Sequence, residues 1–240
     1  MPLQNRVDPF GALQAVPDRG LFMGNRGGCF HRENQTLKGR HWTSKRWIIC
    51  VLSFKDRKRK LMQPGLYTEL FFLDEATALA GGHRPCFECR RAEASAFRDG
   101  LITLGHLRAG ETIDKLDALA AGEIQAVLSG ATDREAVSPE SLPDGAMYAT
   151  GGAAYLKHDS AARAWSFEGY GARQPLHATG ERLTPHITCE ALRAGYSPIL
   201  HPSVTACPLR LQKKRLSTIS ASRPCSAAGS GLRSWNSSAR

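Results

Sequence analysis

The chain has 240 residues, of which 42% are hydrophobic, and a net charge of +10. This length suits one ordinary domain or two small ones, and the apolar content can fill a core, which excludes collagen-like, fully disordered and coiled-coil proteins. No segment approaches the roughly 20 apolar residues that span a bilayer, and the first residues lack a basic region followed by an apolar run. We therefore expect an unsecreted, cytoplasmic protein.

The positive charge is concentrated at the two ends of the chain. Residues 1–99 carry a net charge of +7, residues 100–202 carry −4, and residues 203–240 carry +7. The last block has no Asp, Glu, Phe or Tyr and nine serines, a composition typical of disorder. Two interpretations of this block stay open: a basic arm that binds nucleic acid, or the frameshifted end of a domain that closes near His201.

The first hundred residues predict strands followed by helices. The glycine-rich segment 23–28 is expected to be a flexible loop. The apolar runs 47–54 and 65–72 predict two strands, which we expect to pair as a hairpin around the charged segment between them. Asp74 can cap a helix over 73–80, which two glycines then end. A second helix is expected over 90–98 and closes at Gly100.

The middle of the chain predicts short helices and then a small sheet. Residues 109–129 have apolar residues near helical spacing, interrupted by Gly122, which indicates two short helices. The runs 146–150, 153–157 and 163–167 predict an antiparallel sheet that ends at residues 169–171. Thr184 and Pro185 precede a further helix over 186–194.

The strongest local signal is the C-x-x-C of Cys86 and Cys89, in a turn that Pro85 tightens. Seven cysteines without a signal peptide indicate reduced thiols and not a disulfide framework. A C-x-x-C turn holds two thiolates about one edge of a tetrahedral zinc site apart, and the following helix N-terminus, with Arg90 and Arg91, would stabilise them. The alternative is a redox-active C-x-x-C, but the βαβ surroundings of a thioredoxin-type site are missing.

Two more ligands must come from upstream, where the candidates are Cys29, His31, His41 and Cys50. We expect His31, Cys50, Cys86 and Cys89 to bind Zn²⁺, with Cys29 as the substitute, because Cys29 and His31 are too close for both to be needed. The alternative is that Cys50 is a buried core thiol and His31 an ordinary loop histidine.

These elements together predict an α+β protein. We expect a small zinc-knuckle α/β part over residues 1–100, a helical segment over 101–135, a small antiparallel β-rich part with a terminal helix over 136–202, and a disordered basic tail over 203–240.

Residues 71–89, FFLDEATALAGGHRPCFEC, resemble the second half of the Ada-type zinc-binding domain. That pattern has an aromatic residue, a short alanine-rich helix, and then Arg-Pro-Cys-x-x-Cys. The matching positions here are Phe72, Glu75, Ala76, Ala80, Gly82, Arg84, Pro85, Cys86 and Cys89. The family uses a four-ligand zinc in the repair of methylated DNA phosphates, so the resemblance implies that Cys86 and Cys89 are zinc ligands.

The chain departs from this family in several places. Gly81 stands where alanine is usual and His83 where an aromatic residue is usual. The family's first half has two cysteines four residues apart, one of which accepts the methyl group. This chain has instead Cys29 and His31, separated by one residue, and an isolated Cys50. Methyl transfer is therefore not expected to carry over, since a thiol within an apolar strand is poorly accessible.

A dense group of cations lies between residues 32 and 60 and would suit a phosphate backbone. Trp42 and Trp47 interleave with these charges and are candidates for stacking on bases. The alternative is a solvated turn with both tryptophans in the core. The candidate phosphate-binding residues are Arg40, Lys45, Arg46, Arg57, Lys58 and Arg59.

From these features we expect a zinc-binding protein that binds nucleic acid and is linked to DNA repair or processing. The sequence assigns no catalytic residue, because the histidines and aspartates of the middle segment have no spacing that implies a site. The competing hypotheses are a hydrolase or transferase with a purely structural zinc, and a scaffold that binds another protein.

Overall fold

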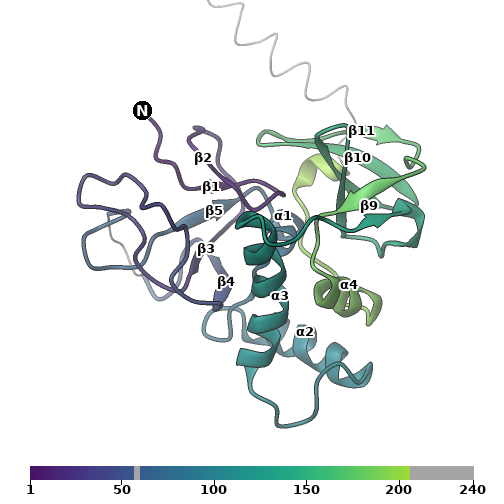
Figure 1. Ribbon diagram of the computed structural model, residues 1–240, viewed down its shortest axis with the longest axis horizontal. Helices are drawn as coiled ribbons and strands as arrows, with labels where there is room; N and C mark the ends of the chain where they lie inside the picture. Colours follow the sequence, from purple (N-terminus) through teal and green to yellow (C-terminus); the bar gives the residue numbers. More distant parts are fainter. Residues whose placement is uncertain (57–59, 206–240) are drawn as a thin grey trace, which may run out of the picture. The chain divides into compact units, whose positions relative to one another are not determined.

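Two six-stranded sheets and four α-helices make up the described part of the chain, residues 1–56 and 60–205, in the computed structural model (Figure 1). This architecture confirms the predicted α+β class. The predicted disorder of residues 206–240 lies outside the described residues, but Ser203 and Val204, at the start of the predicted tail, are buried in a 3₁₀ turn, Pro202–Val204. No helix among the described residues is both long and apolar enough to cross a bilayer.

The first sheet is mixed and is built from the N-terminal part of the chain, in the order β2-β1-β5-β3-β4-β6. Its strand β3 pairs antiparallel with both β4 and β5, and β6 pairs parallel with β4. The strands are β1 Arg6–Val7, β2 Leu13–Gln14, β3 Phe22–Arg26, β4 Trp47–Val51, β5 Leu70–Phe72 and β6 Arg84–Pro85.

The predicted hairpin of the runs 47–54 and 65–72 is wrong, because β3 lies between the two strands. The segment expected to be a flexible glycine-rich loop is largely this central strand. A Cβ atom at Gly24 would lie 2.1 Å from the carbonyl oxygen of Ile48 and 2.9 Å from the ring of Phe72. Glycine is therefore required here for the close approach of neighbouring strands, and not for flexibility.

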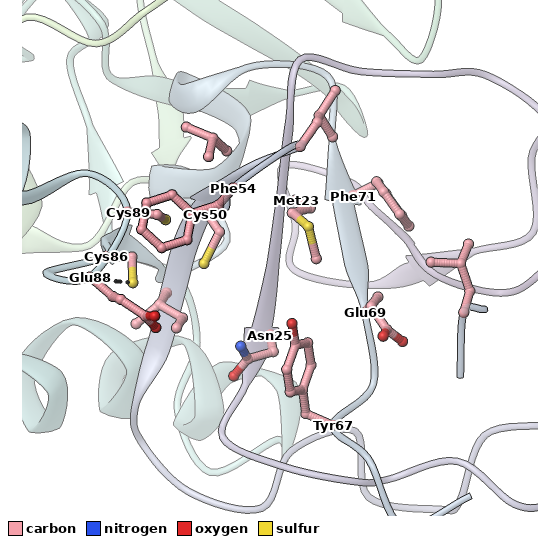
Figure 2. A pocket seen from close by; sticks show the side chains of 14 residues that line it. Met23, Asn25, Cys50, Phe54, Tyr67, Glu69, Phe71, Cys86, Glu88 and Cys89 are labelled. Atoms are coloured by element: carbon pink, nitrogen blue, oxygen red, sulfur yellow. Dashed lines mark hydrogen bonds between the residues drawn. The ribbon is translucent and has the colours of Figure 1, made fainter. Parts of the chain in front are cut away.

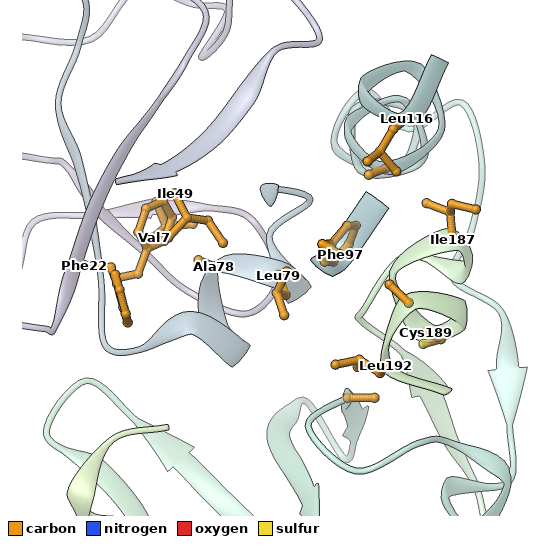
Figure 3. Close-up of a cluster of buried hydrophobic side chains, with 14 of the residues drawn as sticks. Val7, Phe22, Ile49, Ala78, Leu79, Phe97, Leu116, Ile187, Cys189 and Leu192 are labelled. Atoms are coloured by element: carbon orange, nitrogen blue, oxygen red, sulfur yellow. The ribbon is translucent and has the colours of Figure 1, made fainter. Parts of the chain in front are cut away.

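Side chains alternate between the two faces of this sheet, as the pleat of a β-strand requires. Along β3 and β4 the residues Phe22, Gly24, Trp47 and Ile49 are buried, while those between them are only partly buried. The buried face belongs to a core that continues as far as the helix over residues 186–193 (Figure 3). The half-exposed face carries Cys50 (Figure 2).

The helices agree with the predicted positions but differ in their ends. Their bounds are α1 Glu75–Ala80, α2 Arg91–Thr103, α3 Ile113–Leu128 and α4 His186–Arg193. Asp74 caps α1 by accepting the N–H of Thr77 at 2.9 Å. Helix α2 continues through Gly100, where a Cβ atom would lie 2.9 Å from the Cβ of Ala194. The prediction of two short helices over 109–129 is wrong, because α3 is continuous through Gly122 and its buried face, which includes Leu116 and Ile124, holds it in place.

The second sheet is antiparallel, as predicted, with the order β11-β10-β9-β8-β12-β7. Residues 169–171, where the sequence predicts its end, begin strand β11, and the sheet continues beyond them into β12. The strands are β7 Ala136–Val137, β8 Met147–Thr150, β9 Ala153–His158, β10 Ala161–Ser166, β11 Gly169–Gln174 and β12 Gly180–Arg182. Helix α1 contacts this sheet, since Trp165 donates its indole N–H to Thr77 at 3.0 Å and Tyr170 donates its hydroxyl to Asp74 at 3.2 Å.

Candidate metal centre

Three cysteines meet where β4 and β6 run side by side. The pairing of Ile49 with Pro85 sets the register, and the N–H of Cys86 donates to the carbonyl of Ile49 at 3.0 Å. This brings the C-x-x-C turn beside Cys50, the next residue of β4. The sulfur atoms of Cys50, Cys86 and Cys89 all lie within 4.8 Å of one another (Figure 2). They form a cluster that could hold a metal ion such as zinc.

The donor set fits zinc. With Zn–S bonds of about 2.3 Å, the sulfur atoms of a tetrahedral site are about 3.8 Å apart, so side-chain adjustments of a fraction of an ångström suffice. Cys86 is buried, and Cys50 and Cys89 are half-buried. Thiolate sulfur selects soft and borderline metals such as zinc over magnesium or calcium, which prefer oxygen.

The thiols of the cluster perturb one another's pKa values. The pKa of Cys86 is lowered to about 5, first by a hydrogen bond from the Cys50 thiol and also by the N–H groups of Cys89 and Glu88, the latter at 3.4 Å. The pKa of Cys50 is raised, because hydrogen bonding with the Cys86 and Cys89 sulfurs favours its protonated form and because it is desolvated. Three adjacent thiolates repel one another, so all three ionise together only around a cation.

Buried ion pairs fix both ends of the C-x-x-C turn. Before it, Arg84 donates two hydrogen bonds, of 2.7 and 3.0 Å, to Asp117 of α3. After it, Arg90 donates two hydrogen bonds, of 2.8 and 3.0 Å, to Glu75 of α1. The expectation that the charge of Arg90 stabilises the thiolates is therefore wrong, since a buried carboxylate, Glu75, already neutralises its guanidinium. Both arginines flank the cysteines in the sequence, but neither carboxylate partner is predicted there, because Glu75 and Asp117 lie on other helices.

The structure does not bring His31 or Cys29 into this cluster. The two ring nitrogens of His31 lie 2.7 Å from the Thr68 hydroxyl and 3.1 Å from the Gln63 carbonyl, and the nearest ring nitrogen is 3.8 Å from the Cys29 sulfur. The register explains this placement, because the pair follows the end of β3 that faces Trp47, whereas Cys50 faces Met23 near the other end.

His41, the remaining upstream candidate, lies beside the ring of Phe30, with the ring centroids 6.4 Å apart. It is half-exposed, and the pKa of its imidazole is lowered by desolvation and by the charge of Arg26. Among the described residues, it too lies outside the group of metal-ligating side chains.

The predicted phosphate-binding residues are only partly described. Arg40, Lys45 and Arg46 are exposed, and Arg46 pairs with the exposed Asp114 at 3.1 Å. Arg57, Lys58 and Arg59 lie outside the described residues.

The expectation that Trp47 stacks on bases is wrong, because its side chain is fully buried. The guanidinium of Arg26 lies 4.0 Å from the centre of its ring, and the half-buried Trp42 packs beside it with ring centroids 5.9 Å apart. The alternation along β4 places Trp47 on the core face of the sheet. Trp47 therefore belongs to the fold and is not available to a ligand.

The fold and site define an α+β protein with a three-cysteine cluster that could bind a metal ion. No protein-family model, curated protein or solved structure matches the chain.

Proposed function

We propose that this chain is a zinc-binding protein whose metal is held by Cys50, Cys86 and Cys89. The observation that carries the proposal is the convergence of three sulfur atoms within 4.8 Å from two separate parts of the sequence. The two arginine–carboxylate pairs support it, since they fix the C-x-x-C turn independently of the metal. Pre-positioned ligands bind a metal with less loss of conformational entropy.

Elemental analysis of the purified chain tests this proposal. We expect one zinc per chain, and a large loss of zinc in Cys50→Ser or Cys89→Ser, because a serine hydroxyl is a poor zinc ligand. Cys29→Ser is the matched control and is expected to keep its zinc. A wild-type chain without zinc, or a Cys29→Ser variant that loses it, would contradict the proposed ligand set.

We also propose that exposed cations of the N-terminal part bind the phosphate backbone of nucleic acid, in a role linked to DNA repair or processing. The net charge of +7 over residues 1–99 supports this, as does the exposure of Arg40 and Lys45 in the segment between β3 and β4. Phosphate contacts of this kind provide affinity without sequence preference.

Salt-dependent binding to random duplex DNA tests the nucleic-acid proposal. We expect the affinity to fall steeply with salt. The double variant Arg40→Ala/Lys45→Ala should reduce the slope of log affinity against log salt by roughly 2, because each neutralised phosphate contributes about 0.9 to that slope. Arg173→Ala, an exposed arginine of the second sheet, is the control and is expected to leave the slope unchanged. Binding that does not respond to salt would favour a protein-binding scaffold instead.

A further inference from the structure

The sheet face that carries Cys50 is also the floor of a cavity of about 300 Å³. Met23 lies between Cys50 and Phe71, since it pairs with Cys50 on β4 and with Phe71 on β5. Asn25 and Ile48 form the next row of the floor. The side chains of Met23 and Asn25 stand between the cysteines and β5 in Figure 2. The remaining lining includes Phe54, Leu61 and Tyr67.

All three cysteines line this cavity, so the metal cluster and the cavity adjoin each other. Within residues 1–56 and 60–205, no further His, Cys, Asp or Glu joins them within 4.8 Å. Zinc held by three protein ligands keeps a fourth position for an exogenous ligand. Since Cys50, Cys86 and Cys89 all line the cavity, a ligand for such a position would come from the cavity.

The charge of the centre selects the type of donor atom. Three thiolates around one Zn²⁺ leave a net charge of −1. An anionic fourth ligand would increase this charge in a half-buried site, where charge is costly to desolvate. A neutral donor avoids that cost, and the neutral donors that zinc commonly takes in proteins are water and an imidazole-type nitrogen. Of these two, only a nitrogen that belongs to a ring can also cover the apolar part of the cavity floor.

The floor of the cavity selects the size and shape of the ligand. Cys50 and Phe71 are separated by two inter-strand spacings, about 10 Å in total, and the surface between them is the apolar side chain of Met23. A single five-membered ring would cover only the part nearest the cysteines, whereas a fused bicyclic ring reaches across Met23. The carboxamide oxygen of Asn25, which also lines the cavity, accepts the N–H of Gly27 at 3.0 Å, so its NH₂ group is the part that can donate to a ligand.

On the basis of the zinc site proposed above, we propose that this cavity binds a planar fused heterocycle whose neutral imidazole-type nitrogen completes the zinc coordination. Benzimidazoles and purine bases share this chemistry. The two sources differ in the sugar and phosphate that a nucleotide carries.

Spectroscopy of the full chain loaded with Co²⁺ tests this inference, because the visible bands of tetrahedral Co²⁺ report directly on its ligands. We expect benzimidazole to change these bands, and imidazole to bind about tenfold more weakly, because it lacks the fused ring that is buried against the apolar floor. Indole, which has the bicyclic shape but no coordinating nitrogen, is expected to leave the bands unchanged. A change with guanosine that matches the one with benzimidazole would assign the source as a purine nucleoside.

Two variants separate the cavity from the metal. Met23→Phe places a larger side chain on the cavity floor, in the space that the fused ring would occupy. This variant is expected to keep Co²⁺ but to lose the response to benzimidazole. Phe71→Leu, a milder change, should weaken the response severalfold, while Phe167→Leu in the turn between β10 and β11 should not.

Two results would overturn the inference alone: a chain that binds Co²⁺ but shows no response to benzimidazole, or one that binds imidazole as tightly. A chain that binds no Co²⁺ would overturn the proposed zinc site as well.

Discussion

Removing the metal from this protein is expected to lower its free energy of unfolding by about 4 kcal/mol when zinc had been present at a thousand times its dissociation constant. The reason is that the three sulfur ligands come from β4 and from the turn before α2, which are 36 residues apart in the chain. They converge only in the folded state, so binding stabilises that state selectively.

Denaturant titration with and without a strong chelator measures this effect. The wild-type chain should lose stability in chelator, and Cys86→Ser should start at the lower stability and not respond to chelator. Cys29→Ser should respond as the wild type does, because its sulfur lies beside His31 and outside the cluster. Equal unfolding midpoints for the wild type with and without chelator would show that zinc does not hold this part of the fold together.

The C-x-x-C half of the site could be predicted because its determinants are local. Pro85 and the cysteine spacing define the turn, and the capped helix before it and the helix after it follow from short-range signals. The place of Cys50 beside Cys86 is harder to predict, since it depends on a parallel pairing between strands far apart in the chain. The sequence indicates a strand there but not its partner.

The expectation for His31 depended on topology that the sequence does not contain. Cys29 and His31 directly follow the glycine-rich segment 23–28. If that segment were a flexible loop, it could carry them to the metal. In the structure that segment is the central strand β3, and its register with β4 carries residues 29–31 away from Cys50. Glycine is ambiguous in sequence because it serves both flexible loops and the close approach of strands. Only the carbonyl of Ile48 beside Gly24 distinguishes the two.

The cavity face was also beyond sequence reasoning, although a signal for it exists. Residues 22–26 alternate between buried and half-buried positions, but Gly24 and the buried Arg26 interrupt the apolar pattern that marks a strand. Arg26 is tolerated on the core face because it stacks on Trp47 and donates to the carbonyl of Gly11 at 2.9 Å. The strand that forms the cavity floor is therefore not predicted from the sequence, because its pattern includes Arg26, a charged residue that only tertiary contacts allow to be buried.

Glu75→Leu is expected to destabilise the fold by about 3–5 kcal/mol, because it leaves the buried guanidinium of Arg90 without its partner. Glu75 is fully buried, and besides Arg90 its carboxylate accepts the hydroxyl of Tyr196 and, at 2.9 Å, the N–H of Ile199. One side chain thus joins α1, the start of α2 and the segment after α4. The loss should be visible as a lower denaturant midpoint.

A double-mutant cycle separates the ion pair from the other contacts of Glu75. Glu75→Leu/Arg90→Met should cost less than the sum of the two single changes, because no charge is then left buried alone. Glu93→Ala is the control, since its carboxylate is partly exposed and lies 3.8 Å from Arg90, and it should change stability by about 0.5 kcal/mol or less. Because Arg90 directly follows Cys89, both single variants should also bind zinc more weakly than the control. Unchanged zinc affinity in destabilised Glu75→Leu would mean that the cysteine turn holds its geometry without this anchor.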